Sequence, residues 1–242
     1  MVTTDLATII ILGNLVIFAA SLLQAVAGFG FAMIAIPCMA LIDISLVPGV
    51  SLVTGLIISV VMYFDERDEV DWREIRILVP VVIIGTVIGA GLALMLPLHL
   101  AGMVFSSAIL IAIVATIFTP PVALNGWTLG AGGMAAGIMG TVSGLHGPPM
   151  AIVYQHQAPA KIRATIAAIF IFANIFSITA LFAVAKISLT IVTIALGFLP
   201  GLGLGLMLAR RLRHLVSRKL ARAMVLTLAS LSAFLLLQQS LS

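Results

Sequence analysis

The residues of this sequence that could do chemistry inside a membrane are polar but uncharged. All eight acidic residues fall between Asp5 and Glu74, and none stands in the middle of a long apolar run. Proton-driven and cation-binding transporters often place a carboxylate at mid-membrane, because a buried charge there needs a functional reason. The absence of such a carboxylate argues against a cationic substrate and against coupling through a buried Asp or Glu.

The polar residues that remain in the apolar runs can donate hydrogen bonds to an anion. They gather around two interruptions, Gly28-Phe29-Gly30 and Gly144-Leu145-His146-Gly147-Pro148-Pro149. After each interruption a new helix is expected to begin, and the free N–H groups of a helix start carry partial positive charge. Prolines suit a first helical turn, where no N–H is required. Two helix starts approaching from opposite sides of the membrane would form an anion site without lysine or arginine.

The candidate substrate-binding residues belong to these interruptions or stand near them within the apolar runs: Gln24, Gly28, Phe29, Gly30, Thr54, Thr141, Ser143, Gly144, His146, Gly147 and Asn174. Taken singly, Gln24, Thr54 and Asn174 fit a structural role as hydrogen-bonding residues between helices equally well. His146 fits an anion ligand or a proton carrier, since the pKa of imidazole lies near neutrality. Phe29 fits either a gate or simple packing.

The elements that must position these residues are membrane-spanning helices. The chain is 62% hydrophobic and 8% charged, with a mean hydropathy of +1.30, which is far more apolar than a soluble domain. A helix of about 20 apolar residues crosses the hydrocarbon layer. Two runs, 5–43 and 127–156, are overlong and contain the interruptions, so we predict re-entrant hairpins there. Six runs have ordinary spanning lengths: 46–64, 77–96, 98–118, 162–184, 189–208 and about 220–237.

The distribution of Lys and Arg supports the second hairpin. If 127–156 enters and leaves on one side, eleven of the twelve basic residues share one face and Lys186 alone lies on the other. If 127–156 crossed fully, the split would be four against eight. The positive-inside rule favours the hairpin. It predicts a multi-pass protein of the cell inner (cytoplasmic) membrane with both termini outside and these loops in the cytoplasm: 65–76, 119–126, 157–163 and 209–222.

An offset of 116 residues aligns the two halves of the chain: it places Gly28 on Gly144, Gly85 on Gly201 and Gly89 on Gly205. We predict an all-α membrane protein with one domain, residues 1–242, made of repeat 1 (1–118) and repeat 2 (119–242). Each half holds one broken hairpin and three transmembrane helices, so the second repeat is inverted. Inverted repeats with discontinuous helices are typical of secondary transporters, whose substrate lies where the repeats meet. The spaced glycines indicate internal packing, with a homodimer contact as the alternative.

Other functional classes fit the sequence poorly. It has no H-E-x-x-H motif, no other metal-ligand cluster and no intramembrane Asp pair, so we expect neither an enzyme nor a metal. The basic residues stand in short gaps between apolar runs, which argues against a nucleic-acid partner. Cys38 is the single cysteine and excludes an internal disulfide. No cofactor is expected, while coupling to Na⁺ or H⁺ is left open.

At the two interruptions the sequence resembles the sulfite exporter TauE/SafE family. The resemblance lies in Gln24-Ala-Val-Ala-Gly-Phe-Gly-Phe-Ala-Met-Ile-Ala-Ile-Pro37, in Gly140-Thr-Val-Ser-Gly-Leu-His-Gly-Pro-Pro149 and in the order of the apolar runs around both. It covers essentially the whole chain. It implies export of anions such as sulfite and organosulfonates (sulfoacetate, for example), with the glycine motifs and nearby polar residues lining the pathway. His146 and the Pro-Pro pair depart from the family pattern, which is often richer in glycine there.

These observations together predict a secondary transporter that exports a small anion by alternating access. An inside-negative potential of about 100 mV favours expelling each negative charge by roughly 2.3 kcal/mol, so export needs no coupling ion. An anion channel with the same site and a carrier of another small anion, such as a carboxylate, are the alternatives.

Overall fold

The long apolar runs form helices, and glycines divide the two longest runs where the sequence predicts. The structure, a computed structural model, describes residues 5–120, 122–155, 157–212, 215–216 and 218–241. Over these residues the secondary structure is helical, in this order: α1 (Leu6–Ala27), α2 (Phe31–Ile42), η1 (Ile44–Leu46), α3 (Gly49–Glu66), η2 (Arg67–Glu69), α4 (Trp72–Met95), α5 (Leu98–Phe118), α6 (Gly126–Ser143), α7 (Gly147–Val153), α8 (Pro159–Ala183), α9 (Leu189–Leu196), α10 (Leu199–Leu212) and α11 (Arg218–Leu241).

The two breaks share one backbone geometry. Gly28 ends α1 at φ 84° and Gly144 ends α6 at φ 83°, both in the left-handed region. The N–H of Gly28 donates to the carbonyl of Gln24 over 2.7 Å, and the N–H of Gly144 donates to the carbonyl of Gly140 over the same distance. Glycine adopts this conformation without the steric penalty that a Cβ would bring. Both helices therefore stop inside an apolar run.

Within the described part of the chain, six helices are long and apolar enough to cross a bilayer, namely α1, α3, α4, α5, α8 and α11. The pair α9 and α10 raises the number to seven if it counts as one span. Large apolar side chains in the middle of these helices face outward. Val87 of α4 is 66% exposed and Ile111 of α5 is 67% exposed. Such exposure suits lipid rather than water. The chain is thus an all-helical, multi-pass membrane protein, as predicted.

The run 189–208 is not the straight span that the sequence suggests. Its two helices, α9 and α10, meet at an angle of 44°. Asn14 of α1 satisfies backbone groups on both sides of the bend: its Nδ2 donates to the carbonyl of Gly197 (3.1 Å) and its Oδ1 accepts from the N–H of Gly201 (2.8 Å). The Phe198 ring lies against Gly13, where a Cβ would overlap it. A residue from the other half of the chain therefore stabilises this bend.

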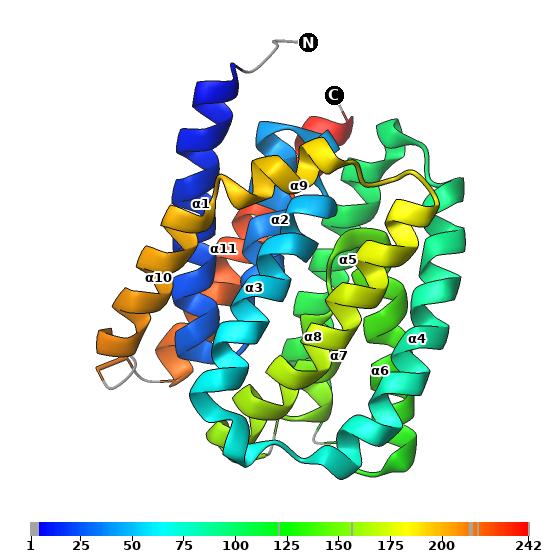
Figure 1. Ribbon diagram of the computed structural model, residues 1–242, viewed down its shortest axis with the longest axis vertical. Coiled ribbons are helices and arrows are strands. Elements are labelled where there is room, and N and C mark those ends of the chain that lie inside the picture. The colour runs from blue at the N-terminus through cyan, green and yellow to red at the C-terminus, as the bar shows by residue number, and fades with distance from the viewer. Residues whose placement is uncertain (1–4, 121, 156, 213–214, 217, 242) are drawn as a thin grey trace.

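The helices form a bundle with both termini at one end (Figure 1). At the opposite end, called the loop end below, lie the connections from α3 to α4, from α5 to α6 and from α7 to α8. Helix α1 descends from the terminus end and α2 returns to it, whereas α6 rises from the loop end and α7 returns there. The two broken hairpins thus enter the bundle from opposite ends. Their arms are unequal, because α1 with 22 residues is itself long enough to span.

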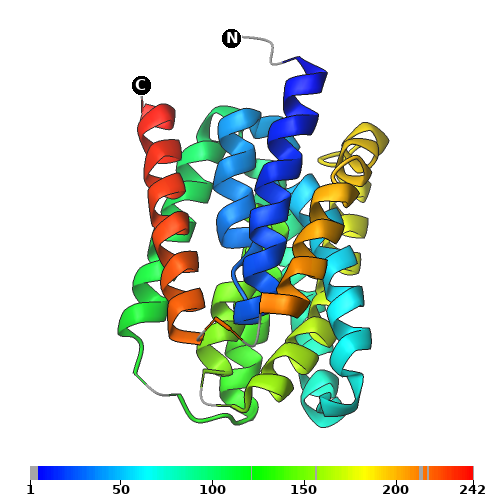
Figure 2. The same cartoon turned by 90° about the vertical axis from the view of Figure 1, so that its left-hand side faces the viewer.

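Glycine faces bring α4 against α6 (Figure 1) and α10 against α1 (Figure 2). A Cβ added at Gly89 of α4 would come within 2.8 Å of the Ile138 carbonyl oxygen. A Cβ at Gly205 of α10 would come within 3.1 Å of the Leu22 nitrogen. The offset of 116 residues places Gly89 on Gly205 and Leu22 on Ile138. The contact between α4 and α6 therefore corresponds to the contact between α10 and α1. These glycines serve packing inside the chain, as the sequence indicates.

Candidate functional site

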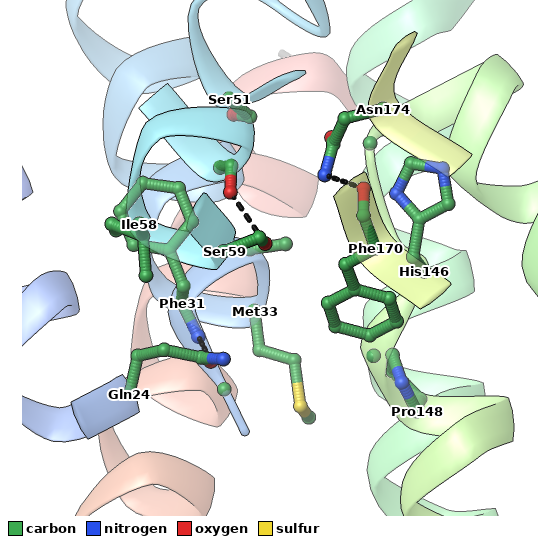
Figure 3. Close-up of a pocket in the computed structure, with 15 residues that line it drawn as sticks. Gln24, Phe31, Met33, Ser51, Ile58, Ser59, His146, Pro148, Phe170 and Asn174 are labelled. Carbon is green, nitrogen blue, oxygen red and sulfur yellow. Dashed lines mark hydrogen bonds between the residues drawn. The ribbon is translucent and has the colours of Figure 1, made fainter. Parts of the chain in front are cut away.

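The two helix breaks border one small cavity in the middle of the bundle, called the central cavity below (Figure 3). Its volume is about 30 Å³, which is room for roughly two water molecules. The lining comes from the end of α1, the starts of α2 and α7, and the middles of α3 and α8. Its residues are Gln24, Gly30, Phe31, Ala32, Met33, Ser51, Gly55, Ile58, Ser59, Gly144, His146, Gly147, Pro148, Phe170 and Asn174.

Gln24 joins the two arms of the first hairpin. Its Oε1 accepts a hydrogen bond from the N–H of Phe31, the first residue of α2, over 2.9 Å. The remaining N–H groups of a first helical turn have no partner within their own helix. Two residues of that turn, Ala32 and Met33, line the central cavity. The start of α2 therefore borders the cavity, and the presentation of its N–H groups to an anion stays a prediction.

The start of α7 presents fewer donors than expected. Among its first three residues only Gly147 has an N–H, because the next two are Pro148 and Pro149. The helix is only seven residues long, so its dipole is weak. The two helix starts are thus not equivalent, because the prolines leave the first turn of α7 with fewer N–H groups than the first turn of α2. The prolines suit the first turn of α7, as predicted, yet they remove the N–H groups that an anion would bind.

His146 lies on the central cavity and is held by a chain of hydroxyl groups. Its Nε2 lies 3.3 Å from Ser177 Oγ, and Ser177 Oγ lies 2.8 Å from Thr141 Oγ1. The imidazole packs on Gly140, where a Cβ would overlap the ring, and its centroid lies 5.8 Å from that of the Phe170 ring. The side chain is 3% exposed. These contacts fix the ring in one place beside the second break.

Ser51 brings the least satisfied polar group to the central cavity. Its hydroxyl is buried and has no hydrogen-bond partner in the structure, and the residue is 3% exposed. Its neighbours are satisfied: Ser59 Oγ donates to the Gly55 carbonyl (2.7 Å), and Asn174 Nδ2 donates to the Phe170 carbonyl (2.7 Å). A buried polar group without a partner costs about 1–3 kcal/mol. A ligand with acceptor atoms would remove that cost.

Six of the eleven predicted residues line the central cavity: Gln24, Gly30, Gly144, His146, Gly147 and Asn174. The other five lie elsewhere. The hydroxyls of Thr54, Thr141 and Ser143 donate to carbonyls four residues earlier in their own helices. Gly28 faces Arg163, whose Cγ lies 3.0 Å from a Cβ placed on that glycine. Phe29 lines a different cavity, nearer the loop end.

The sequence interpretation missed the cavity face of α3. That face carries Ser51, Gly55 and Ser59, which recur every four residues and so lie on one side of a helix. This spacing of small and polar residues was the available signal. Thr54 stands between them in sequence but points to another side, and Ser177, the partner of His146, was also missed.

The ion pairs of the described residues lie at the loop end, and the described residues that line the central cavity include no Lys, Arg, Asp or Glu. Lys161 Nζ lies 2.9 Å from Asp71 and 2.6 Å from Glu74. Tyr154 Oη donates to Glu74 over 2.6 Å. The Lys161 ammonium, which donates to Asp71, holds the pKa of the Asp71 carboxyl below its ordinary value.

Two further ion pairs lie at the loop end. Arg163 pairs with Glu66 and Arg210 pairs with Asp65, each over 2.7 Å. With the Lys161 cluster, they join acidic residues of the first half of the chain to basic residues of the second half. These acidic residues therefore serve contacts between the halves.

Comparison with known protein families matches residues 14–236 to the sulfite exporter TauE/SafE family. No curated protein and no solved structure matches the chain. The match covers both helix breaks, the central cavity and the loop-end ion pairs. The chain therefore belongs to the sulfite exporter TauE/SafE family, which is a family of membrane transporters and not of enzymes.

Proposed function

We propose that this transporter exports a small sulfur-containing anion, sulfite or an organosulfonate such as sulfoacetate, and that the anion binds in the central cavity. The observation that carries the proposal is the unpaired Ser51 hydroxyl on a cavity that also receives the amide-rich start of α2. These groups donate hydrogen bonds to oxyanions. Among the described residues, no carboxylate lines the cavity to repel an anion or to bind a cation.

An inverted repeat with alternating access is the mechanism we propose. Helix contacts that correspond between the two halves support it. Helix α4 packs on α6 in the same way as its counterpart α10 packs on α1, and the counterparts α3 and α8 pack on each other in the middle. The matching geometry of Gly28 and Gly144 supports it further. In this class of transporter one repeat rocks against the other around a fixed central site.

A carrier fits the cavity better than a channel does. At about 30 Å³, the central cavity has room for roughly two water molecules, which is less than an open pore needs. Side chains around it must therefore move before an anion with three oxygens can bind or leave. We place the loop end in the cytoplasm, because ten of the eleven basic residues that the structure describes belong to segments at that end. Arg213 and His214 of the last of these segments lie outside the described residues.

A thermal-stability screen of the purified protein tests the substrate class. Sulfite, sulfoacetate, taurine, sulfate, thiosulfate and short carboxylates are added one at a time. We expect sulfite or sulfoacetate to raise the melting temperature most, and Gln24→Ala to abolish the rise. Ser106→Ala is the matched control, because Ser106 is buried on α5 and donates to the Gly102 carbonyl. Stabilisation by cationic amines and by none of the anions would overturn the proposal.

Counterflow in proteoliposomes tests the mechanism. A carrier exchanges labelled sulfite faster when unlabelled sulfite is present on the far side, since the loaded site returns faster than the empty one. Saturable flux with such stimulation is expected. High flux without saturation or stimulation would identify a channel instead.

A further inference from the structure

A second cavity, called the loop-end vestibule below, lies between α5, α7, α8 and α11 on the loop-end side of the helix breaks. Its volume is about 220 Å³, several times that of the central cavity. Its lining includes Phe29, Thr116, Ile152, Gln155, Ile166 and Arg222. Unlike the central cavity, it therefore holds a cationic side chain, that of Arg222.

Arg222 has no carboxylate partner among the described residues. Its Nη2 donates to the Thr116 carbonyl over 2.7 Å, and the ion pairs of the described residues leave it out. Lys161, Arg163 and Arg210 at the same end are each paired with an acidic residue. A half-buried guanidinium without a counter-charge carries a desolvation cost.

The helices around the loop-end vestibule supply no counter-charge to Arg222. The sequence has no Asp or Glu after residue 74, so α5, α7, α8 and α11, which surround the loop-end vestibule, carry none. A bound ligand is therefore the counter-charge that we infer for Arg222. Its chemistry is that of an oxyanion, because guanidinium groups bind such groups through paired hydrogen bonds.

The loop-end vestibule and the central cavity follow one another along the same elements. On α8, Ile162 and Ile166 line the vestibule, and Phe170 and Asn174 line the central cavity. These four residues are spaced by four and share one face of the helix. On α7, Ile152 lines the vestibule, whereas Pro148 one turn earlier lines the central cavity. The chain passes from one cavity to the other at the first break, between Phe29 and Gly30.

We propose that the loop-end vestibule is the waiting site of the transported anion on the cytoplasmic side, and that Arg222 binds the anion there before it reaches the central cavity. Phe29 stands at the boundary between the two cavities. This inference rests on the proposed function, which supplies the anion and the direction. The phosphate of a lipid headgroup shares the chemistry of such an anion and is the competing occupant.

Sided transport kinetics test the role of Arg222. Uptake of radiolabelled sulfite is measured in proteoliposomes whose loop end faces outward, and then from the opposite face. We expect Arg222→Gln to raise the KM from the loop-end face by about tenfold, the scale of one lost charge-assisted hydrogen bond, with kcat changed less than twofold. From the opposite face the KM should change much less. Arg222→Lys should recover part of the loss.

Arg211→Gln is the matched control, because it removes the same charge from an exposed residue of α10 at the same end. Its KM should stay within twofold of the original. Equal changes in the two Gln variants would overturn the proposal, as would an unchanged KM in Arg222→Gln. An unchanged KM is also what we expect if Arg222 binds only a lipid phosphate, because the loss of Arg222 would then alter the stability of the protein and not the KM from the loop-end face.

A labelling experiment tests the loop-end vestibule even if sulfite is not the substrate. Ile152→Cys is introduced in a Cys38→Ser background and treated from the loop-end face with water-soluble thiol reagents, one anionic and one cationic. We expect the anionic reagent to react faster, and Arg222→Gln to lower the ratio of the two rates by about tenfold, the scale of one unit charge acting on each reagent at about 6 Å in water. Arg211→Gln should leave the ratio within twofold.

The outcomes of the two experiments separate the two proposals. Failure of sulfite and of every other tested anion to be transported, with the labelling ratio shifted as expected, would reject the proposed substrate and keep an anion-attracting vestibule. Transport of sulfite with no labelling at Ile152→Cys, or with no dependence on Arg222, would keep the substrate and reject the vestibule.

Discussion

Ser51 holds a buried hydroxyl that has no hydrogen-bond partner among the residues that the structure describes. Native proteins leave few such groups, and each carries a free-energy cost of about 1–3 kcal/mol in the unliganded state. If the proposed anion binds there, it would remove this cost, so the hydroxyl that destabilises the unliganded protein would stabilise the complex. Thr86 on α4 is the other buried side chain without a partner among the described residues, and it does not line the central cavity.

Ser51→Ala should therefore separate stability from binding. We expect the variant without anion to be as stable as the original or more stable by up to about 1 kcal/mol, because the unpaired group is gone. Sulfite affinity should fall about five- to tenfold, on the scale of one lost hydrogen bond. Melting curves and titration calorimetry measure the two effects. Thr86→Val should give the stability effect alone, and a loss of affinity in that control would remove Ser51 from the site.

Asp71 predicts how stability depends on pH. The hydrogen bond from Lys161 is the largest cause that holds the pKa of the Asp71 carboxyl below its ordinary value of 3.8. A carboxyl with a lowered pKa in the folded state stabilises the fold above that value, and the contribution is lost as pH falls through the lowered pKa. Asp71→Asn should therefore lose less stability than the original between pH 5 and pH 3. Melting temperatures across that range test the sign, and identical pH profiles would contradict it.

At the scale of elements, the glycines of α6 have unequal roles. A Cβ at Gly140 would overlap the His146 ring, whereas a Cβ at Gly130 on the same helix would meet nothing within 4 Å. The first glycine makes room for the side chain that lines the central cavity. The second only lowers the helix propensity of α6.

Gly140→Ala should destabilise the protein by about 1–3 kcal/mol, the usual cost of overpacking a buried contact. It should also displace His146 from Ser177 and so weaken sulfite binding. Gly130→Ala should instead stabilise the protein by about 0.5–1 kcal/mol, because alanine favours a helix over glycine. Unfolding measured in denaturant on both variants gives the comparison. Similar stabilities for the two would show that His146 does not need the space above Gly140.

The sequence predicted where helices break better than which side of a helix faces the central cavity. Both helix breaks were predictable, because glycines with a left-handed conformation interrupt an apolar run whatever surrounds them. The side of α3 that meets the cavity was not, because Ser51 and Thr54 are both small hydroxyl residues near mid-span and only packing decides between them. The bend between α9 and α10 was missed for a related reason: Asn14, which satisfies it, stands 183 residues before Gly197.

At the scale of the whole molecule, the ion pairs at the loop end close that end of the bundle. Lys161 reaches Asp71 and Glu74, and the other pairs likewise join the first half of the chain to the second. An alternating-access cycle must separate the halves at this end to admit an anion from the loop-end vestibule. The free energy of these pairs then sets the balance between states closed and open at the loop end.

Lys161→Met should shift that balance toward the open state. It leaves Glu74 without its ammonium partner in the closed state, at a cost of about 1–3 kcal/mol, and every 1.4 kcal/mol changes the ratio of two states tenfold. A cysteine at Ser59, which lines the central cavity, reports the open state in a Cys38→Ser background. We expect a thiol reagent added from the loop-end face to label this cysteine about tenfold faster or more.

Lys186→Met is the control, because Lys186 lies at the terminus end and donates to the Leu96 carbonyl. This variant should leave the labelling rate unchanged. Equal rates in both variants would mean that the loop-end ion pairs stabilise the fold without governing access to the cavity.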